Sequence, residues 1–166
     1  FTLGVNAFYT YYALPFAPLA RPYTAHYFRG RQTAGASLDW AWQILKLSLY
    51  GEAATDAKRD LALSQTRVWL PQNAFKLVFQ HRHLAAAYYA PVGKAVQAGS
   101  RNANEHGALL ALQWTFAKHW QWRTTADLFY FPQPTYNASL PSKGLRLRTE
   151  LHFLPSHNCT WLARYD

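Results

Sequence analysis

The most regular feature of the chain is an alternation of apolar and polar side chains with a period of two residues. Residues 145–153, for example, place Leu, Leu, Thr, Leu and Phe at odd positions and Arg, Arg, Glu and His at even ones. This period predicts a β-strand with one apolar and one polar face. The segments that show the period, strongly or weakly, are 1–11, 34–43, 45–52, 60–69, 75–80, 108–116, 120–128, 145–153 and 158–165. We therefore expect roughly nine strands of about ten residues, the length that a tilted strand needs to cross a bilayer.

The connections between these segments alternate in length. The longer ones are 15–32, 55–59, 83–104 and 131–143, and the shorter ones are 43–45, 70–73, 117–119 and 155–158. Membrane barrels built up-and-down have short periplasmic turns and long extracellular loops. We therefore predict an all-β fold, an antiparallel up-and-down transmembrane β-barrel, with residues 1–166 as one domain. Because single-chain bacterial barrels have an even number of strands, an odd count leads us to expect a partial barrel from a longer chain.

Tryptophans lie near the predicted strand ends or on the apolar faces. The candidates for a membrane interface are Trp40, Trp42, Trp69, Trp114, Trp120 and Trp122. An indole ring has a dry body and a polar edge, which suits the headgroup level of a membrane. The same period would also fill the core of a soluble β-barrel that binds a lipophilic or anionic ligand. Strand length and loop alternation favour the membrane interpretation, with the soluble barrel as the alternative.

Composition excludes several classes of protein. The single Cys159 rules out a disulfide framework and a CxxC metal or redox site. Residues 1–20 carry no charge, but Pro15 and Pro18 make them a poor membrane helix, and they lack the basic start of a signal peptide. The 17 Lys and Arg exceed the 8 Asp and Glu, which gives a formal net charge of +9. A basic balance of this kind raises the question of where the cations lie.

If the apolar faces meet lipid, the alternating polar side chains line the interior. The proposed lumen-lining residues are Lys46, Lys76, Gln80, Arg82, Arg123, Arg146, Arg148 and Glu150. An interior with this excess of cations would favour anions, phosphate groups or nucleic acid. The alternative is an interior that is filled by a plug or cross-linked by arginine–carboxylate pairs. Glu150 is a candidate partner for Arg146 or Arg148.

The long predicted loops hold a second set of cations. They are Arg21, Arg29, Arg31, Lys58, Arg59, Lys94 and Arg101. Such side chains can bridge lipopolysaccharide phosphates or contact DNA, although a solvated loop surface is the simpler interpretation.

Metal and catalytic signals are weak. His81 and His83 share a strand face, but no third ligand has a clear spacing, so we expect neither a metal site nor a cofactor. Ser100, Glu105 and His106 hold the residue types of a rim hydrolase, which is an alternative function. No GxSxG, HExxH or phosphate-binding glycine loop is present, and we expect a protein that is not an enzyme.

Several short motifs resemble a known family. They are Ala36-Ser37-Leu38-Asp39-Trp40, Tyr50-Gly51-Glu52-Ala53-Ala54, Tyr88-Tyr89, Asn104-Glu105-His106-Gly107 and Ala126-Asp127-Leu128-Phe129-Tyr130-Phe131-Pro132. Their order and spacing resemble the barrel portion of Bacteroidota helix-hairpin-helix (ComEA-like) outer-membrane proteins. The resemblance covers most of the chain from about residue 33 and implies a barrel that follows helix-hairpin-helix repeats, which this sequence does not contain. It also implies a link to DNA uptake.

The sequence therefore predicts a porin-like protein of the bacterial outer membrane. We expect a channel or a structural component of a membrane complex, linked to the passage of DNA or anions. The expected partners are outer-membrane lipid and lipopolysaccharide, together with other outer-membrane or periplasmic proteins, and nucleic acid has weaker support.

Overall fold

A computed structural model describes residues 1–58, 60–72, 74–91, 96–156 and 159–166, without the side chains of residues 71, 72, 156, 159 and 160. Within these residues the protein is one antiparallel sheet with a single 3₁₀ turn, η1 (Pro22–Thr24). The strands are β1 (Thr2–Phe16), β2 (Gly30–Ile44), β3 (Leu47–Asp56), β4 (Leu61–Gln72), β5 (Phe75–Leu84), β6 (Glu105–Ala117), β7 (Trp120–Phe131), β8 (Ser142–Ser156) and β9 (Cys159–Tyr165). The predicted all-β class and the nine strands are confirmed.

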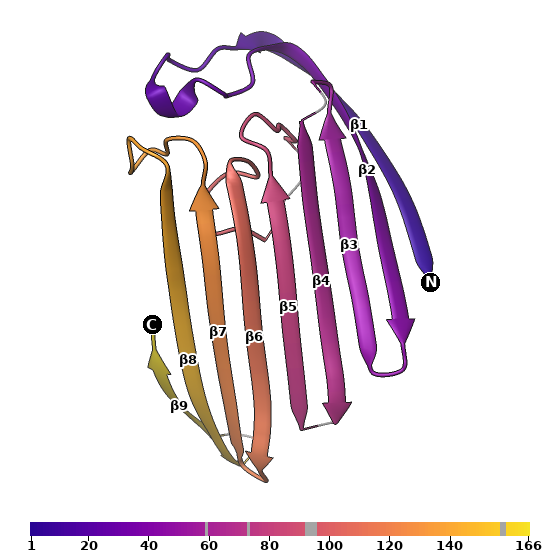
Figure 1. The fold of residues 1–166 in the computed structure, drawn as a ribbon, viewed down its shortest axis with the longest axis vertical. Coiled ribbons are helices and arrows are strands. Elements are labelled where there is room, and N and C mark those ends of the chain that lie inside the picture. Colours follow the sequence, from indigo (N-terminus) through magenta and orange to yellow (C-terminus); the bar gives the residue numbers. More distant parts are fainter. Residues whose placement is uncertain (59, 73, 92–95, 157–158) are drawn as a thin grey trace.

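The strands follow one another across the sheet in the order of the sequence, each antiparallel to the next. All the longer connections lie at one end of the sheet, which we call the long-loop end, and the two-residue turns lie at the opposite, short-turn end (Figure 1). The sheet does not close, because β1 and β9 pair with one neighbour each. The predicted up-and-down order of the strands is confirmed. The strands form an open, curved sheet.

β1 is longer than the sequence pattern predicts. Its pairing with β2 continues to Tyr11, shifts register, and resumes where Phe16 faces Gly30. Pro15 lies in this irregular stretch of an edge strand. A proline is tolerated there because its missing N–H interrupts no regular hydrogen bonding between strands. The charge-free segment is thus a strand rather than a helix.

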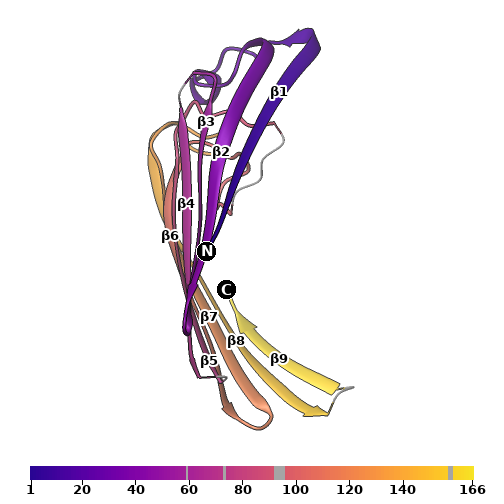
Figure 2. The same ribbon diagram turned by 90° about the vertical axis from the view of Figure 1, so that its right-hand side faces the viewer.

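The sheet is curved, with both edge strands on the same side of the middle strands (Figure 2). The described residues of the long β5–β6 loop, 85–91 and 96–104, lie on this concave side. The strand registers place the polar half of each alternating pattern there; Arg146 of β8 faces Asp127 of β7, for example, while Leu147 and Ala126 face each other on the convex side.

Few apolar side chains are buried. The one buried apolar cluster of the described residues is formed by Ala54, Tyr88 and Ala103, where the β5–β6 loop covers the concave face. On the convex side large apolar residues are exposed, such as Val5 at 75% and Leu145 at 62%. The sheet therefore has no conventional core, and its convex apolar face is left uncovered.

Candidate functional site

The concave face carries most of the charged side chains of the sheet. By register they are Asp39, Glu52, Asp56, Lys76, Arg82, Glu105, Arg123, Asp127, Arg146, Arg148, Glu150 and Arg164. The carboxylates of Asp39, Glu52 and Asp56 lie on β2 and β3, whereas four of the arginines lie on β7 to β9. The face therefore has an acidic side and a basic side instead of a uniform positive charge.

A buried ion network lies at the centre of the long-loop end. The Arg82 guanidinium is fully buried; its Nε donates to Glu105 Oε1 at 2.5 Å and its Nη2 donates to Asp127 Oδ1 at 2.8 Å. These three side chains come from β5, β6 and β7, so the network ties adjacent strands together. Two carboxylates leave the trio with a formal charge of −1. A buried charge of this kind persists only when hydrogen bonds compensate it.

Backbone amides of the β5–β6 loop supply that compensation. The N–H of Ala98 donates to both carboxylate oxygens of Glu105, at 2.9 and 3.0 Å, and the N–H of Gly99 donates to Oε2 at 2.8 Å. The loop is also bound at its start, where the N–H of Tyr89 donates to Asp56 Oδ2 at 3.1 Å. Carboxylates of two strands, Asp56 and Glu105, therefore hold the described parts of the loop against the concave face.

The loop also contacts the first strand and the first loop. The hydroxyls of Tyr12 and Tyr89 are 2.7 Å apart, and the ring of Tyr89 stacks on Phe28 with 4.6 Å between centroids. Burial, followed by this hydrogen bond, raises the pKa of Tyr89 to about 12. The phenol is consequently a neutral hydrogen-bonding group at physiological pH.

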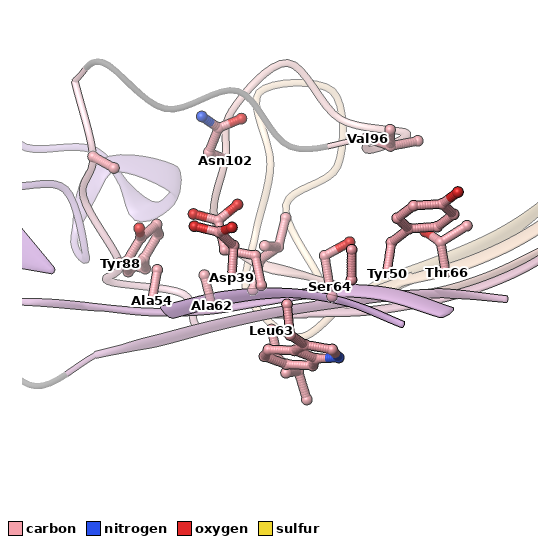
Figure 3. Close-up of a pocket in the computed structure, with 16 residues that line it drawn as sticks. Asp39, Tyr50, Ala54, Ala62, Leu63, Ser64, Thr66, Tyr88, Val96 and Asn102 are labelled. Atoms are coloured by element: carbon pink, nitrogen blue, oxygen red, sulfur yellow. The ribbon is translucent and has the colours of Figure 1, made fainter. Parts of the chain in front are cut away.

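One cavity lies between the β5–β6 loop and strands β2 to β4. It has a volume of about 420 Å³. Figure 3 shows Asp39 rising from the sheet toward Asn102, and Tyr50 and Thr66 rising toward Val96, whereas Leu63 lies on the opposite side. Asp39 accepts a hydrogen bond from Asn6 at 2.9 Å and stands opposite Glu52 in register. This cavity has an acidic floor.

A second cavity, of about 400 Å³, lies at the long-loop end between the loops 17–29, 85–104 and 132–141 and the strands β7 and β8. Its cations are Arg101, whose Cζ lies 3.5 Å from the centroid of the Tyr27 ring, and Arg146, whose Cζ lies 5.9 Å from that of Phe129. Burial lowers the pKa of Arg101, an effect that Tyr27 opposes. Burial, and after it the charge of Arg101, lowers the pKa of His26, which also lines the cavity.

The predicted lumen-lining residues fall into three groups. Gln80, Arg82 and Glu150 lie on the concave face in contact with neighbours: Gln80 donates to Ser64 at 3.5 Å, and Glu150 accepts from Arg164 and pairs with His152. Arg148 lies there too and pairs with Asp166. Lys76, Arg123 and Arg146 lie on the same face with no carboxylate of the described residues in ion-pair range. Lys46 lies in the β2–β3 turn, because β3 begins at Leu47, one residue after it.

The tryptophans lie on the convex face. By register Trp40, Trp42, Trp69, Trp114, Trp120 and Trp122 all have their side chains there, together with Trp161, which the sequence pattern did not single out. Trp42, for example, is 50% exposed and Trp161 is 67% exposed. All but Trp40 lie within a few residues of the short-turn end of their strands.

Three histidines, His81, His83 and His106, lie on the convex face as well. Nδ1 of His83 is 2.8 Å from Nδ1 of His106, and His81 lies on the same face of β5. Within the described ranges no group of three or more His, Cys, Asp or Glu side chains is arranged to hold a metal ion.

The three candidate hydrolase residues do not converge. Glu105 and His106 are consecutive in β6, so they point to opposite faces of the sheet. Glu105 binds Arg82 and the loop amides, whereas His106 contacts His83. Ser100 lines the second cavity on the concave side.

Sequence reasoning missed two carboxylates and one glycine of the ion network. Glu105 was considered as a hydrolase residue and as part of a family motif, and Asp127 as part of such a motif. Gly107 faces Arg82 in register, and a Cβ there would overlap the guanidinium. The sequence does place a charged residue near the long-loop end of each of three successive strands, at 82, 105 and 127. Only the register shows that these residues meet.

The predicted loop cations are dispersed. Arg29 donates to the carbonyl of Pro18 at 2.8 Å, and Arg101 lines the second cavity. Arg21 and Lys58 lie in exposed connections, and Arg31 follows the first residue of β2. Arg59 and Lys94 lie outside the described residues.

Comparison of the chain with protein-family models, with curated proteins and with solved structures found no match. None of the described residues belongs to a helix with the length and hydropathy that crossing a membrane requires.

Proposed function

We propose that this chain forms part of the wall of a transmembrane β-barrel in a bacterial outer membrane, where it acts as a channel or as a structural component of a membrane complex. The convex face meets lipid, and the concave face lines the interior. One observation carries the proposal: the convex face is a broad, uncovered apolar surface whose tryptophans gather at one end.

The exposed apolar residues of the convex face extend over every strand from β1 to β9 except β3. They include Leu3, Val5, Leu38, Leu61, Phe79, Leu110, Leu128, Leu145, Leu147 and Trp161. Soluble monomers rarely expose a continuous apolar patch of more than a few hundred Å². A lipid environment removes this surface from water without any covering layer of protein.

Charge is nearly absent from the same surface. Among the described strand residues, the charged side chains on the convex face are Arg67 and Lys143. Lys143 lies at the long-loop end of β8, and Arg67 lies two residues from Trp69 toward the middle of β4. Long cationic side chains at these positions can extend to the headgroups, where they cost far less than at the bilayer midplane.

The tryptophans follow the end of the sheet rather than one row of paired residues. Trp42 faces Leu49 of β3, whereas Trp69 faces Leu47, two residues closer to the turn. Trp114, in turn, faces Phe75, the first residue of β5. The short-turn ends of the strands lie progressively lower in Figure 1 from β2 to β6, the order in which these tryptophans are displaced. An aromatic belt that keeps level with the ends of staggered strands is typical of a membrane boundary.

Closure of the wall requires further strands. β1 and β9 each have one side without a strand partner in the sheet, and an open edge facing lipid costs several kcal/mol per unpaired backbone group. In this proposal strands from elsewhere in the polypeptide or from other chains pair with these edges.

The interior would influence which ions pass. Lys76, Arg123 and Arg146 are the concave cations without an ion pair among the described residues, so they supply the field that favours anions. The passage of DNA is a narrower version of the proposal, and it rests on the resemblance to the helix-hairpin-helix outer-membrane proteins.

Fractionation tests the membrane assignment. The full-length protein should sediment with outer membranes, need detergent for extraction, and migrate differently on gels before and after heating. Protein that stays in solution without detergent would favour the soluble ligand-binding barrel instead.

Conductance tests the channel version. In planar bilayers, Arg123→Glu should shift selectivity toward cations more than Arg148→Glu, because Arg148 is already paired with Asp166. No shift in Arg123→Glu would show that Arg123 does not line the conducting path. Equal shifts in both variants would show that the pairing with Asp166 does not mask the charge of Arg148. If the protein stays in the membrane but conducts no ions, the channel version is excluded and the structural role is the one that remains.

A further inference from the structure

The cavity at the long-loop end has the composition of a binding site for an anion. Arg101 lines it from the β5–β6 loop and Arg146 from β8. Within the part of the chain that the structure describes, no carboxylate lies in ion-pair range of either guanidinium. Arg101 is partly buried over the Tyr27 ring, an arrangement that desolvates the cation without neutralising it. A desolvated cation binds an anion more strongly than a hydrated one does.

The acids beside the cavity already bind other groups. Asp127, which faces Arg146 in register, accepts a hydrogen bond from Arg82. Glu105 lies behind Gly99, where a Cβ would approach its Oε2 to 3.4 Å. Its two oxygens accept hydrogen bonds from Arg82, Ala98 and Gly99. The carboxylate therefore holds the wall of the cavity in place and does not neutralise Arg101.

The remaining walls suit a ring with hydroxyl groups. Tyr23 and Tyr136 meet edge to face with 5.6 Å between centroids, and Phe129 lies beneath Arg146. Ser100, Thr135 and Asn137 add neutral donors and acceptors. Aromatic faces beside hydroxyl and amide groups are the combination that packs against a sugar ring and hydrogen-bonds its hydroxyls.

The site is also pre-formed. Asn104 Nδ2 donates to the carbonyl of Gln133 at 3.0 Å, and the N–H of Gln133 donates to Asn104 Oδ1 at 2.8 Å, which joins two of the three loops. Asn104 has a φ of 60°, a conformation that asparagine adopts more readily than most residues. At about 400 Å³, the cavity is within the range of small-ligand sites.

We infer that this cavity binds an anionic sugar, whose phosphate or carboxylate lies between Arg101 and Arg146 and whose ring packs against the tyrosines. The inference goes beyond the proposed function, since the cavity is formed by this chain alone and its binding can be measured without a closed or conducting barrel.

Calorimetric titration of the detergent-solubilised full-length protein tests the inference. Glucose 6-phosphate or glucuronate should bind saturably, and which of them binds more tightly identifies the anion. Glucose and inorganic phosphate should each bind at least about tenfold more weakly, because each lacks one half of the recognised group. Failure of both anionic sugars to bind would overturn the inference, and so would equal binding of glucose.

Variants locate the site. Arg101→Gln and Arg146→Gln should each weaken binding about 10- to 100-fold, the range expected for loss of a charge-assisted hydrogen bond. Arg101→Lys, which keeps the charge and loses the planar fork, should bind with intermediate affinity. Arg123→Gln removes a cation of the same face outside the cavity and is the matched control. An effect of Arg123→Gln as large as that of Arg101→Gln would contradict the assigned position.

A measurement on the wild-type protein tests the position of the site even if a variant folds poorly. The imidazole resonances of His26 in the wild-type protein should shift on addition of the bound sugar, since His26 lines the cavity beside Arg101. Saturable binding that leaves His26 unperturbed would place the ligand elsewhere and refute the inference.

Discussion

Gly107 of β6 lies directly opposite Arg82 of β5, and the guanidinium occupies the space that any larger residue at 107 would need for its Cβ. Because Gly107 has no side chain, the buried Arg82 guanidinium can reach both Glu105 on β6 and Asp127 on β7. This relationship fixes the centre of the long-loop end, and the loop that covers the concave face depends on it.

Gly107→Ala should displace Arg82 and destabilise the folded protein. The added methyl group cannot be accommodated without moving the guanidinium away from Glu105, and overpacking of this kind costs about 1–3 kcal/mol. Urea unfolding in detergent measures the change. Ala111→Ser, which adds one atom on the same face of β6, is the control and should change the free energy of unfolding much less. Equal effects of the two substitutions would contradict the assigned contact.

Arg82→Gln should be more damaging than Gly107→Ala. It leaves Glu105 and Asp127 without their cation in a buried site, and breaking such a group typically costs about 3–5 kcal/mol. Arg123→Gln on the same face removes an exposed cation with no ion pair among the described residues and should change stability by less than about 0.5 kcal/mol. If the two variants unfold at the same urea concentration, the network does not contribute to stability as described.

Glu105→Gln should release the β5–β6 loop. The carboxylate accepts hydrogen bonds from the amides of Ala98 and Gly99, and a neutral amide oxygen accepts them less strongly. Hydrogen–deuterium exchange should therefore accelerate at residues 98 and 99. Glu150→Gln makes the same chemical change on β8, away from the loop, and should leave exchange there unaltered. Unchanged protection in Glu105→Gln would mean that the loop is held by other contacts.

His26 should titrate below its ordinary value of 6.5. Burial disfavours the imidazolium, and the charge of Arg101 adds to that effect, so the unfolded loop binds a proton more readily than the folded loop does. The local stability that His26 contributes is therefore lost as the pH falls below 6.5 through the folded pKa. An NMR titration should show the lowered pKa. In Arg101→Gln the pKa should rise but stay lowered, since burial remains; a pKa unaffected by that substitution would rule out the contact.

Much of the fold follows from the alternation of residue types. Segments such as 120–128 and 145–153 have a clean period of two, and the structure places them in β7 and β8 with the polar half on one face. The extension of β1 to Phe16 was not predicted, because Pro15 reads as a strand end unless the strand is known to lie at an edge. Lys46 was assigned to a strand for the opposite reason, since its position fits the alternation although the chain turns there.

The candidate sites were harder to predict. Charges that alternate correctly say which face a residue occupies, but not which charges on neighbouring strands face one another. The meeting of residues 82, 105 and 127 depends on the register of three strands and on a glycine that leaves room. The cavity with Arg101 depends on three loops with no periodic pattern. The sequence overestimated the unpaired positive charge of the interior for the same reason. Arg148 and Arg164 are paired with carboxylates that only the structure brings near them.

Tryptophan fluorescence tests most directly whether the convex face meets lipid, because all seven tryptophans of the chain lie on that face. The full-length protein, reconstituted in vesicles, should be quenched strongly by phospholipids brominated near the headgroup end of the acyl chain, less by lipids brominated near the midplane, and little by iodide in the water. Strong quenching by iodide together with no quenching by any brominated lipid would show that the convex face meets water and not lipid.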